Sequence, residues 1–335
     1  MQSGAGILRL LVTGGAGFIG SNFVRMVLGE NPILSNVEKL TVLDSLTYSG
    51  NLSNLASVSD GNRYEFVRGD INNKELVDRL VKESNCIVHF AAESHVDRSI
   101  DSGRKFIETN VLGTQTLLDA ARNNSGIKFV HVSTDEVYGS INTGSWTEEH
   151  PIEPNSPYAA SKAGSDMLVR AYNKTFGLNT VITRCSNNYG PYQYPEKVIP
   201  LFVTNLIYNK RLPLYGSGKN VRDWLHVDDH CRGIALAIEQ GRSGEIYNLG
   251  GGTELTNIEL TQTILSIMGK SWDLVDHVDD RLGHDLRYNV DISKASRELG
   301  YKPLVKFSEG IEDTILWYQR NQAWWQALTN LEIKL

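Results

Sequence analysis

Two short segments carry side chains that could move protons. The segment 133–136 reads Ser-Thr-Asp-Glu and supplies hydroxyls and two carboxylates, and Tyr158 is followed four residues later by Lys162. Residues at i and i+4 share one face of a helix, so Tyr158 and Lys162 would be neighbours. An ammonium group beside a phenol favours the phenolate, so Tyr158 would act as a base closer to neutral pH than its reference pKa of about 10 permits. The two segments together predict acid–base chemistry.

The surrounding residues predict how these segments are positioned. Residues 128–133 are β-branched and apolar, as in a buried parallel strand, and the polar residues follow at its carboxyl end. Open α/β sheets bind their ligands at that end. After Pro157, a helical pattern runs through Phe176 and carries Tyr158 and Lys162. We therefore expect a strand end and a helix to bring the two segments together.

A glycine-rich turn near the start of the chain indicates a nucleotide site. Residues 8–13 are typical of a short strand, and Gly14, Gly17 and Gly20 follow at once, before a helical pattern that runs to about Gly29. Such glycines permit a tight turn and let a pyrophosphate approach the helix N-terminus. The alternative is a purely structural turn, but the strand before and the helix after favour a dinucleotide site.

The second predicted strand, residues 39–44, ends in the carboxylate of Asp44. An acid at this place accepts hydrogen bonds from a ribose 2′-hydroxyl and repels a 2′-phosphate, so NAD is favoured over NADP. The alternative is that Asp44 only caps a loop. Two later strand ends also suit a cofactor. They carry Asp70 and Ile71, placed to meet the adenine, and Ala91 and Ala92, whose small side chains allow close approach.

Strand-like segments alternate with helical patterns through the first half of the chain. Beyond the two strands above, we expect strands at 64–69, 86–92, 128–133 and 180–185. This alternation predicts an α/β fold with a Rossmann-type doubly wound parallel sheet. We assign residues 1–185, with parts of 225–250, to an NAD-binding domain, and residues 186–335 mainly to a smaller mixed α/β carboxyl-terminal substrate lobe. The chain should end in one helix whose aromatic residues pack in a core or interface: Trp317, Tyr318, Trp324 and Trp325.

The composition and net charge of the chain argue against some classes of protein. The chain has 335 residues, 41% of them hydrophobic, and a formal net charge of −6, which argues against broad binding to nucleic acid or to an anionic membrane. The cysteines at 86, 185 and 231 lie far apart, so we expect reduced, packed thiols and a cytoplasmic protein. No signal peptide or long apolar span is recognised, and residues 1–7 are expected to form a short frayed tail.

The histidines give little support for a metal site. His226 and His230 flank two aspartates, which could suggest metal ligands, but we prefer an interpretation in which Asp228 or Asp229 caps a helix. His89 and His131 lie within predicted strands, and we interpret them as core histidines with satisfied partners. No bound metal is predicted.

Several segments taken together resemble the extended short-chain dehydrogenase/reductase family, and within it the nucleotide-sugar 4,6-dehydratases. They are residues 13–20, 46–51, 91–98, 133–139, 186–192, 221–224 and 280–285. The adjacent Asp135 and Glu136 decide the branch, because sugar-nucleotide epimerases of this family typically carry a small or apolar residue there. The resemblance implies dTDP-glucose as substrate, NAD as a tightly bound and regenerated cofactor, and a homodimer formed through a four-helix bundle.

The resemblance also implies a sequence of steps. Tyr158, supported by Thr134 and Lys162, takes the C4 hydroxyl proton while hydride passes from C4 to NAD. Glu136 then removes the C5 proton, and Asp135 protonates the departing C6 hydroxyl. Hydride returns to C6, and the product is the 4-keto-6-deoxy sugar. Opposite roles for adjacent carboxyl groups require either different environments or a shared proton.

Roles for individual residues follow from the same resemblance. The candidate catalytic residues are Thr134, Asp135, Glu136, Tyr158 and Lys162. The candidate cofactor-binding residues are Gly14, Gly17, Phe18, Ile19, Gly20, Asp44, Leu46, Thr47, Asp70, Ile71, Ala91, Ala92, Ser94, Thr109, Tyr158, Lys162 and Asn188. The candidate substrate-binding residues are Ser94, Thr134, Asn187, Lys197, Val198, Pro213, Tyr215, Arg222, Asn257, Arg281 and His284.

Two departures from the family pattern and three alternatives stay open. Leu282 stands where the family commonly has proline, and the short connection 140–157 resembles the antibiotic-sugar branch. The alternatives are a UDP-glucose 4,6-dehydratase, a nucleotide-sugar 4-epimerase and a catalytically silent dinucleotide sensor. Retention of both acids argues against the epimerase. Retention of all the proton-transfer residues argues against the sensor.

Overall fold

The computed structural model describes residues 6–332 of the chain. Residues 1–5 of the expected N-terminal tail lie outside the described residues. No helix in the described range is long and apolar enough to cross a membrane.

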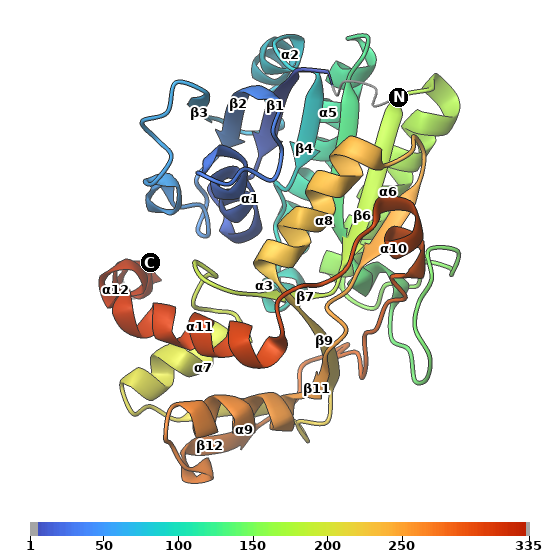
Figure 1. The fold of residues 1–335 in the computed structure, drawn as a ribbon. Helices are drawn as coiled ribbons and strands as arrows, with labels where there is room; N and C mark the ends of the chain where they lie inside the picture. The colour runs from blue at the N-terminus through green and yellow to red at the C-terminus, as the bar shows by residue number, and fades with distance from the viewer. Residues whose placement is uncertain (1–5, 333–335) are drawn as a thin grey trace.

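A large parallel sheet forms one half of the molecule (Figure 1). Its strand order is β3-β2-β1-β4-β5-β6-β10, and every pairing is parallel. The strands are β1 (Leu8–Thr13), β2 (Val37–Asp44), β3 (Tyr64–Arg68), β4 (Cys86–His89), β5 (Lys128–Thr134), β6 (Asn179–Cys185) and β10 (Ile246–Leu249). The predicted α/β doubly wound fold is confirmed, and the predicted strand centres all fall within observed strands.

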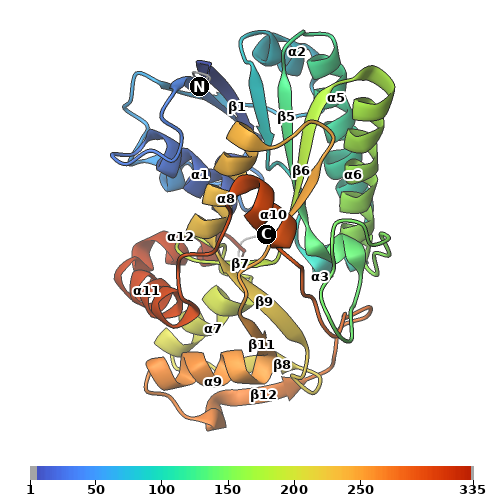
Figure 2. The same cartoon turned by 45° about the vertical axis from the view of Figure 1, so that its right-hand side comes forward.

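Helices cover both faces of this sheet, and Figure 2 shows the two layers on either side of it. The helices of one face are α1 (Phe18–Leu28), α8 (Val227–Gln240) and α10 (Ser293–Leu299), and their apolar residues join one buried cluster with the sheet. The opposite face carries α2 (Lys74–Lys82), α5 (Thr114–Arg122) and α6 (Pro157–Phe176), with a second cluster. Because α8 and β10 come late in the chain, the two halves of the molecule are interleaved.

The smaller half contains two short sheets. One has the order β11-β9-β7 with an antiparallel and a parallel pairing, and the other pairs β12 with β8. The strands are β7 (Asn187–Tyr189), β8 (Leu212–Tyr215), β9 (Val221–His226), β11 (Glu254–Thr256) and β12 (Val275–Val278). The helices are α7 (Val198–Ile207), α9 (Asn257–Ile267), α11 (Phe307–Arg320) and α12 (Gln322–Glu332), which share a third core.

Short helices occupy the connections of the large half. They are η1 (Leu52–Leu55), α3 (Val96–Asp101), α4 (Arg104–Phe106), the π-helix η2 (Ile107–Gly113) and η3 (Asp135–Tyr138). A further short helix, η4 (Trp272–Leu274), lies in the smaller half.

The residues at the two ends of helix α6 explain why its bounds could be predicted from the sequence. Its N-cap Ser156 accepts a hydrogen bond from the Ala159 amide, Pro157 occupies the first turn, and Gly177 ends the helix with φ +68°. A hydroxyl cap, an early proline and a left-handed terminal glycine are all favoured at these positions. The helix therefore spans the predicted residues and fixes Tyr158 and Lys162 on its first two turns.

Two local predictions were wrong. The cap of α8 is His226, whose ring accepts from the Asp228 amide at 3.2 Å, while Asp228 and Asp229 lie in the first turn. Asp229 instead accepts the amides of Leu304 and Val305, a long-range contact with no local sequence signal. The C-terminal aromatic segment forms α11 and α12 rather than one helix. Its packing prediction is nevertheless confirmed, since Tyr318 and Trp325 are buried in the third core.

The buried histidines and cysteines largely match expectation. His89 lies between the hydroxyls of Thr13 at 2.7 Å and Thr114 at 2.9 Å. His131 contacts the Ser165 hydroxyl at 3.2 Å, but its Nδ1 has no hydrogen-bond partner among the described residues. All three cysteines are buried and free.

Candidate active site

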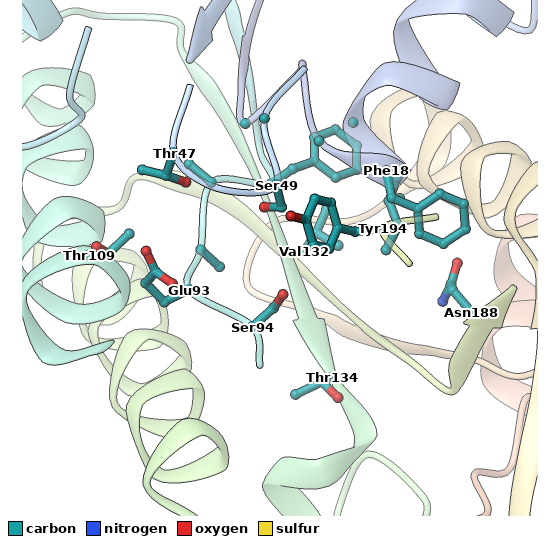
Figure 3. Close-up of a pocket in the computed structure, with 18 of the residues that line it drawn as sticks. Phe18, Thr47, Ser49, Glu93, Ser94, Thr109, Val132, Thr134, Asn188 and Tyr194 are labelled. Atoms are coloured by element: carbon teal, nitrogen blue, oxygen red, sulfur yellow. The ribbon is translucent and has the colours of Figure 1, made fainter. Parts of the chain in front are cut away.

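A cavity of about 320 Å³ opens at the carboxyl ends of the parallel strands, between the two halves of the molecule. Figure 3 shows Thr47, Thr134 and Asn188 reaching it from three different segments. The structure brings all the candidate catalytic residues to this cavity. Except for Leu46, it also brings the candidate cofactor-binding residues there: Gly14, Gly17, Phe18, Ile19, Gly20, Asp44, Thr47, Asp70, Ile71, Ala91, Ala92, Ser94, Thr109, Tyr158, Lys162 and Asn188.

The glycine turn has the geometry that a pyrophosphate needs. Gly14 has φ +70°, and a Cβ there would lie 2.5 Å from the backbone nitrogen of Ala91, so only glycine fits. Gly17 is the N-cap of α1 and offers no side chain, which leaves the first amides of an 11-residue helix facing the cavity. Amides at a helix N-terminus bind anions. The turn therefore suits a dinucleotide phosphate group.

Asp44 makes the loop contacts of the structural alternative and also lies where a ribose could reach it. It lines the cavity at the end of β2, and its carboxylate accepts the amides of Ala16 at 2.9 Å and Leu46 at 2.8 Å. Burial raises the pKa of Asp44 above its usual value, while these two amides oppose the shift. Leu46 adopts φ +54° in this turn and does not line the cavity, so its part is to shape the loop around Asp44.

Tyr158 and Lys162 lie one turn apart at the base of the cavity, and both are buried. Lys162 Nζ donates to the Val132 carbonyl at 2.8 Å, which fixes the ammonium against the end of β5. Burial raises the pKa of Tyr158 well above its usual range, and the carboxyl groups of Glu136 and Asp135 add to the shift. The phenol is therefore neutral in this structure. The expected lowering of its pKa by Lys162 is not found, because burial and the neighbouring acids raise the pKa and only the Thr134 hydroxyl opposes them.

Asp135 and Glu136 occupy the first two positions of η3, directly after β5. Burial raises the pKa of Asp135 well above its usual range, and the charges of Glu136 and Asp223 raise it further. Burial also raises the pKa of Glu136, but the cations Arg222 and Lys197 oppose that shift. The surroundings thus favour a protonated Asp135 beside a Glu136 that ionises more readily.

A buried charge network lies behind the catalytic helix. Asp166, one turn after Lys162 on α6, contacts Arg184 Nε at 2.9 Å and His131 Nε2 at 3.3 Å. Burial alone would raise the pKa of Asp166, but Arg184 and His131 outweigh it and lower the value to about 2. The carboxylate in turn favours the charged form of Lys162, although burial lowers the pKa of this lysine to about 8.

A second cavity of about 200 Å³ adjoins the first on the side of the smaller half. It is lined by the candidate substrate-binding residues Asn187, Lys197, Val198, Pro213, Tyr215, Arg222, Asn257, Arg281 and His284. Ser94 and Thr134 line only the first cavity. Glu136, Asn187 and Lys197 line both, so the two cavities meet beside the Glu136 carboxyl group.

The lining of the second cavity includes arginines that lie against aromatic rings. The Arg222 guanidinium lies 4.3 Å from the centre of the Tyr288 ring, and Arg281 lies 5.3 Å from that of Tyr215. Arg281 also contacts the Asp97 carboxylate at 3.4 Å. Guanidinium groups recognise phosphate oxygens, and an aromatic wall suits a planar base.

Some lining residues were missed by the sequence analysis. In the first cavity they include Tyr48, Ser49, Glu93, Gln193, Tyr194 and Glu196, and in the second His95, Asp97, Asp285 and Tyr288. His230 was also missed, although its ring contacts the Asn188 side chain at 2.9 Å and so holds it in place. Six of the ten lining residues lie inside a recognised motif, and the others follow one by a few positions: Gln193, Tyr194, Glu196 and Tyr288. Proximity to the motifs at 46–51, 91–98 and 186–192 was the available signal.

Sheet order, glycine turn and the Tyr-Lys pair on α6 define a dinucleotide-dependent protein of the extended short-chain dehydrogenase/reductase type. A sequence model described as GDP-mannose 4,6 dehydratase matches residues 11–314, and the chain belongs to this family. The resemblance inferred from the motifs is thereby confirmed.

Two relatives of this chain have high sequence identity to it over almost its whole length. The chain is 58% identical to a dTDP-glucose 4,6-dehydratase from Streptomyces antibioticus, over 96% of this chain and 95% of the relative. It is 56% identical to a dTDP-glucose 4,6-dehydratase from Streptomyces niveus, over 96% of both chains.

Solved structures of similar proteins have the same fold as this chain. A crystal structure of the dTDP-glucose 4,6-dehydratase DesIV from Streptomyces venezuelae, with NAD and TYD bound, is 60% identical, with a TM-score of 0.93 over 96% of this chain and all of that one. A UDP-glucuronic acid 4-epimerase from Bacillus cereus is 30% identical, with a TM-score of 0.87 over 93% of this chain and 99% of that one. The fold is therefore shared with epimerases, and the site must separate the two activities.

Proposed function

We propose that this chain is an NAD-dependent dTDP-glucose 4,6-dehydratase, a hydro-lyase that forms dTDP-4-keto-6-deoxyglucose. One observation carries the proposal. Asp135 and Glu136 directly follow β5 and line the same cavity as Tyr158, Lys162 and the glycine turn. An epimerase needs no pair of carboxyl groups to expel water, so this pair favours dehydration. High identity to the Streptomyces dehydratases supports the same activity.

The first cavity is the proposed cofactor site. Gly14, Gly17 and the N-terminus of α1 would hold the pyrophosphate, and Asp44 would accept the ribose hydroxyls. Ile71 and Ala91 would line the site between the strand ends. NAD held by these residues would supply the redox chemistry, as acceptor of the C4 hydride and as its donor to C6.

Tyr158 is the proposed base for the C4 hydroxyl. Its phenol, whose pKa burial raises, must lose a proton before it can accept one. We assign to the Lys162 ammonium, one turn away on α6, the stabilisation of the resulting phenolate. Thr134 lies beside them at the end of β5 and lines the cavity. Burial removes water that would otherwise screen these charges.

The adjacent acids divide the elimination between them. The C4 ketone acidifies the C5 proton, which Glu136 removes, and Asp135 protonates the C6 hydroxyl so that it leaves as water. Glu136 then returns its proton to C5. Over a turnover, the proton gained by Tyr158 balances the proton lost by Asp135, so the residues require a proton exchange before the next cycle.

The second cavity is the proposed site for the nucleotide part of the substrate. Arg222 and Arg281 would bind the diphosphate, while Tyr215 and Pro213 would face the base. Lys197 lines both cavities, which puts it between the sugar and the phosphates. We accordingly assign the smaller half of the molecule to sugar-nucleotide binding and the large half to NAD binding.

A homodimer forms the next part of the proposal. The exposed side chains of Ile107 and Leu112 on η2 and of Met167 on α6 lie on helices that pack side by side. Two copies of this pair of helices would make the four-helix bundle implied by the family resemblance, with an isologous interface. The three free buried thiols suit the reducing cytoplasm.

Isotope tracing tests the proposed function. With dTDP-[4-²H]glucose, the dehydratase should deliver the deuterium to C6 of the same sugar molecule and release the C6 hydroxyl as water. Mass spectrometry of the product would show it. Loss of the label into free NADH, or a product that keeps its C6 hydroxyl, would contradict the proposal. UDP-glucose in a parallel assay tests the alternative nucleotide, and a C4 epimer would identify a 4-epimerase.

A further inference from the structure

Three segments meet at the edge of the cofactor cavity through a chain of contacts. Arg98 of α3 donates from Nη2 to Glu196 Oε2 at 3.0 Å. Its guanidinium carbon also lies 4.0 Å from the centre of the Tyr48 ring. Arg98 therefore joins the loop after β2 to the segment before α7, which are about 150 residues apart in sequence.

A second contact joins the same two segments. The rings of Tyr48 and Tyr194 meet edge to face, with their centres 5.5 Å apart. Tyr48, Tyr194 and Glu196 all line the cofactor cavity, and Figure 3 includes Tyr194 among the lining residues. We call Tyr48, Arg98, Tyr194 and Glu196 the clasp. Two of its members belong to the large half of the molecule and two to the smaller half.

The clasp also touches the substrate side. Glu196 lines both cavities, and its carboxylate lies 3.7 Å from His95 Nε2. Beside it, Lys197 Nζ donates to the Ser94 carbonyl at 3.0 Å. Only 11% of the Glu196 side chain is exposed, against 43% for Arg98. The carboxylate is thus held inside, and Arg98 closes over it from the solvent side.

We propose that the clasp retains the reduced cofactor during turnover. The proposed reaction uses one nicotinamide twice, so a cofactor lost after the first step would strand the enzyme with a keto sugar. A ring pair and an ion pair across the cavity edge must separate before a bound dinucleotide leaves. Cofactor escape is then slowed by the clasp, while the groups that move protons lie deeper in the cavity. This inference takes the cofactor's identity from the proposed function.

Dissociation kinetics of NADH from the holoenzyme test the clasp without any sugar substrate. Arg98→Met removes the charge and most of the stacking, Glu196→Gln keeps the shape but removes the charge, and Tyr48→Ala removes the ring. Each variant should release NADH about threefold to tenfold faster, measured by stopped-flow fluorescence after a chase with excess NAD. Tyr48→Phe keeps the ring but loses the hydroxyl that hydrogen-bonds Glu196, so its release rate should lie between those of the wild type and Tyr48→Ala. In turnover, an added NADH-trapping dehydrogenase should detect more escaped cofactor.

Arg211→Met is the matched control. Arg211 makes a bidentate ion pair with Asp276 at 2.6 Å within the smaller half, away from both cavities, and its loss should leave NADH release unchanged. A double variant of Arg98 and Glu196 should release NADH no faster than the faster single variant, because the pair acts as a unit. Wild-type release rates in folded Arg98, Glu196 and Tyr48→Ala variants would overturn the clasp. That result would leave the isotope test of the dehydratase untouched.

Discussion

The ammonium of Lys162 donates a hydrogen bond to the main-chain carbonyl of Val132 at 2.8 Å. This contact joins the second turn of α6 to the end of β5, so the two segments that carry the proton-transfer residues are held in one arrangement. The charge of Lys162 is consequently set by the protein interior and by Asp166, which faces it from the same helix.

The pH dependence of kcat should follow Lys162. Burial lowers its pKa to about 8, so the ammonium is charged below pH 8 and neutral above it. Because the proposed role of this charge is to stabilise the Tyr158 phenolate, kcat should fall as the pH rises through 8. Lys162→Met should lower kcat about 10²- to 10⁴-fold. Steady-state assays between pH 6 and 10 measure both effects, and a flat profile to pH 10 would contradict this role.

Replacement of Glu136 and replacement of Asp135 should block different steps of the elimination. Glu136→Gln and Asp135→Asn should each lower the rate of product formation about 10²- to 10⁴-fold while still oxidising C4, visible as NADH absorbance. In D₂O, the Asp135→Asn enzyme should exchange the C5 proton for deuterium, because its base is intact. The Glu136→Gln enzyme should not. Exchange in the Glu136→Gln variant alone would reverse the assignments.

Motifs with strong local causes were predictable from sequence. Gly14 is required by a positive φ and a close backbone contact, and Ser156 and Gly177 mark the ends of α6. Carboxyl ends of parallel strands meet at one edge, so Asp44 and Asp135 could be expected in the same cavity.

Contacts between distant segments were not predictable. Nothing local shows that Tyr48 meets Tyr194 or that Asp229 caps the amides of Leu304 and Val305. Periodicity shows that a face is apolar but not what covers it. Thr114, Leu117 and Leu118 lie on an apolar face of α5, yet they are buried within this chain and so offer no surface to a second copy. The exposed apolar side chains of the neighbouring helices are Ile107 and Leu112 on η2 and Met167 on α6.

Removal of Asp166 should destabilise the fold. Asp166→Asn leaves Arg184 buried without its charged partner, which typically costs about 3–5 kcal/mol. Because the pKa of Asp166 is lowered to about 2, its contribution is complete above its ordinary value near 4 and is lost as the pH falls through 2. Urea unfolding at pH 7 measures the loss. Asp276→Asn, which breaks an exposed pair, should leave the unfolding free energy nearly unchanged.

Asp44 should set the choice between NAD and NADP. Its carboxylate lines the cavity and would repel a 2′-phosphate, so Asp44→Asn should raise NADP affinity relative to NAD about tenfold. Asparagine can still accept from the Ala16 and Leu46 amides, so the loop should keep its shape. Fluorescence titration of both cofactors gives the ratio. If the ratio of the NADP and NAD affinities does not change, the role of Asp44 is only to shape the loop.

The proposed dimer should depend on the exposed faces of η2 and α6. A charge at Leu112 would be buried without a partner if two copies meet there, so Leu112→Asp should shift the protein from dimer to monomer by at least about a hundredfold in dissociation constant. Leu282→Asp is the matched control, since this exposed side chain lies on the loop of the smaller half. Light scattering across a dilution series separates the outcomes. If the wild-type protein is a monomer, the proposed dimer is wrong. If the Leu112→Asp variant remains dimeric, the interface lies elsewhere, because a two-fold contact through these helices could not accept that charge.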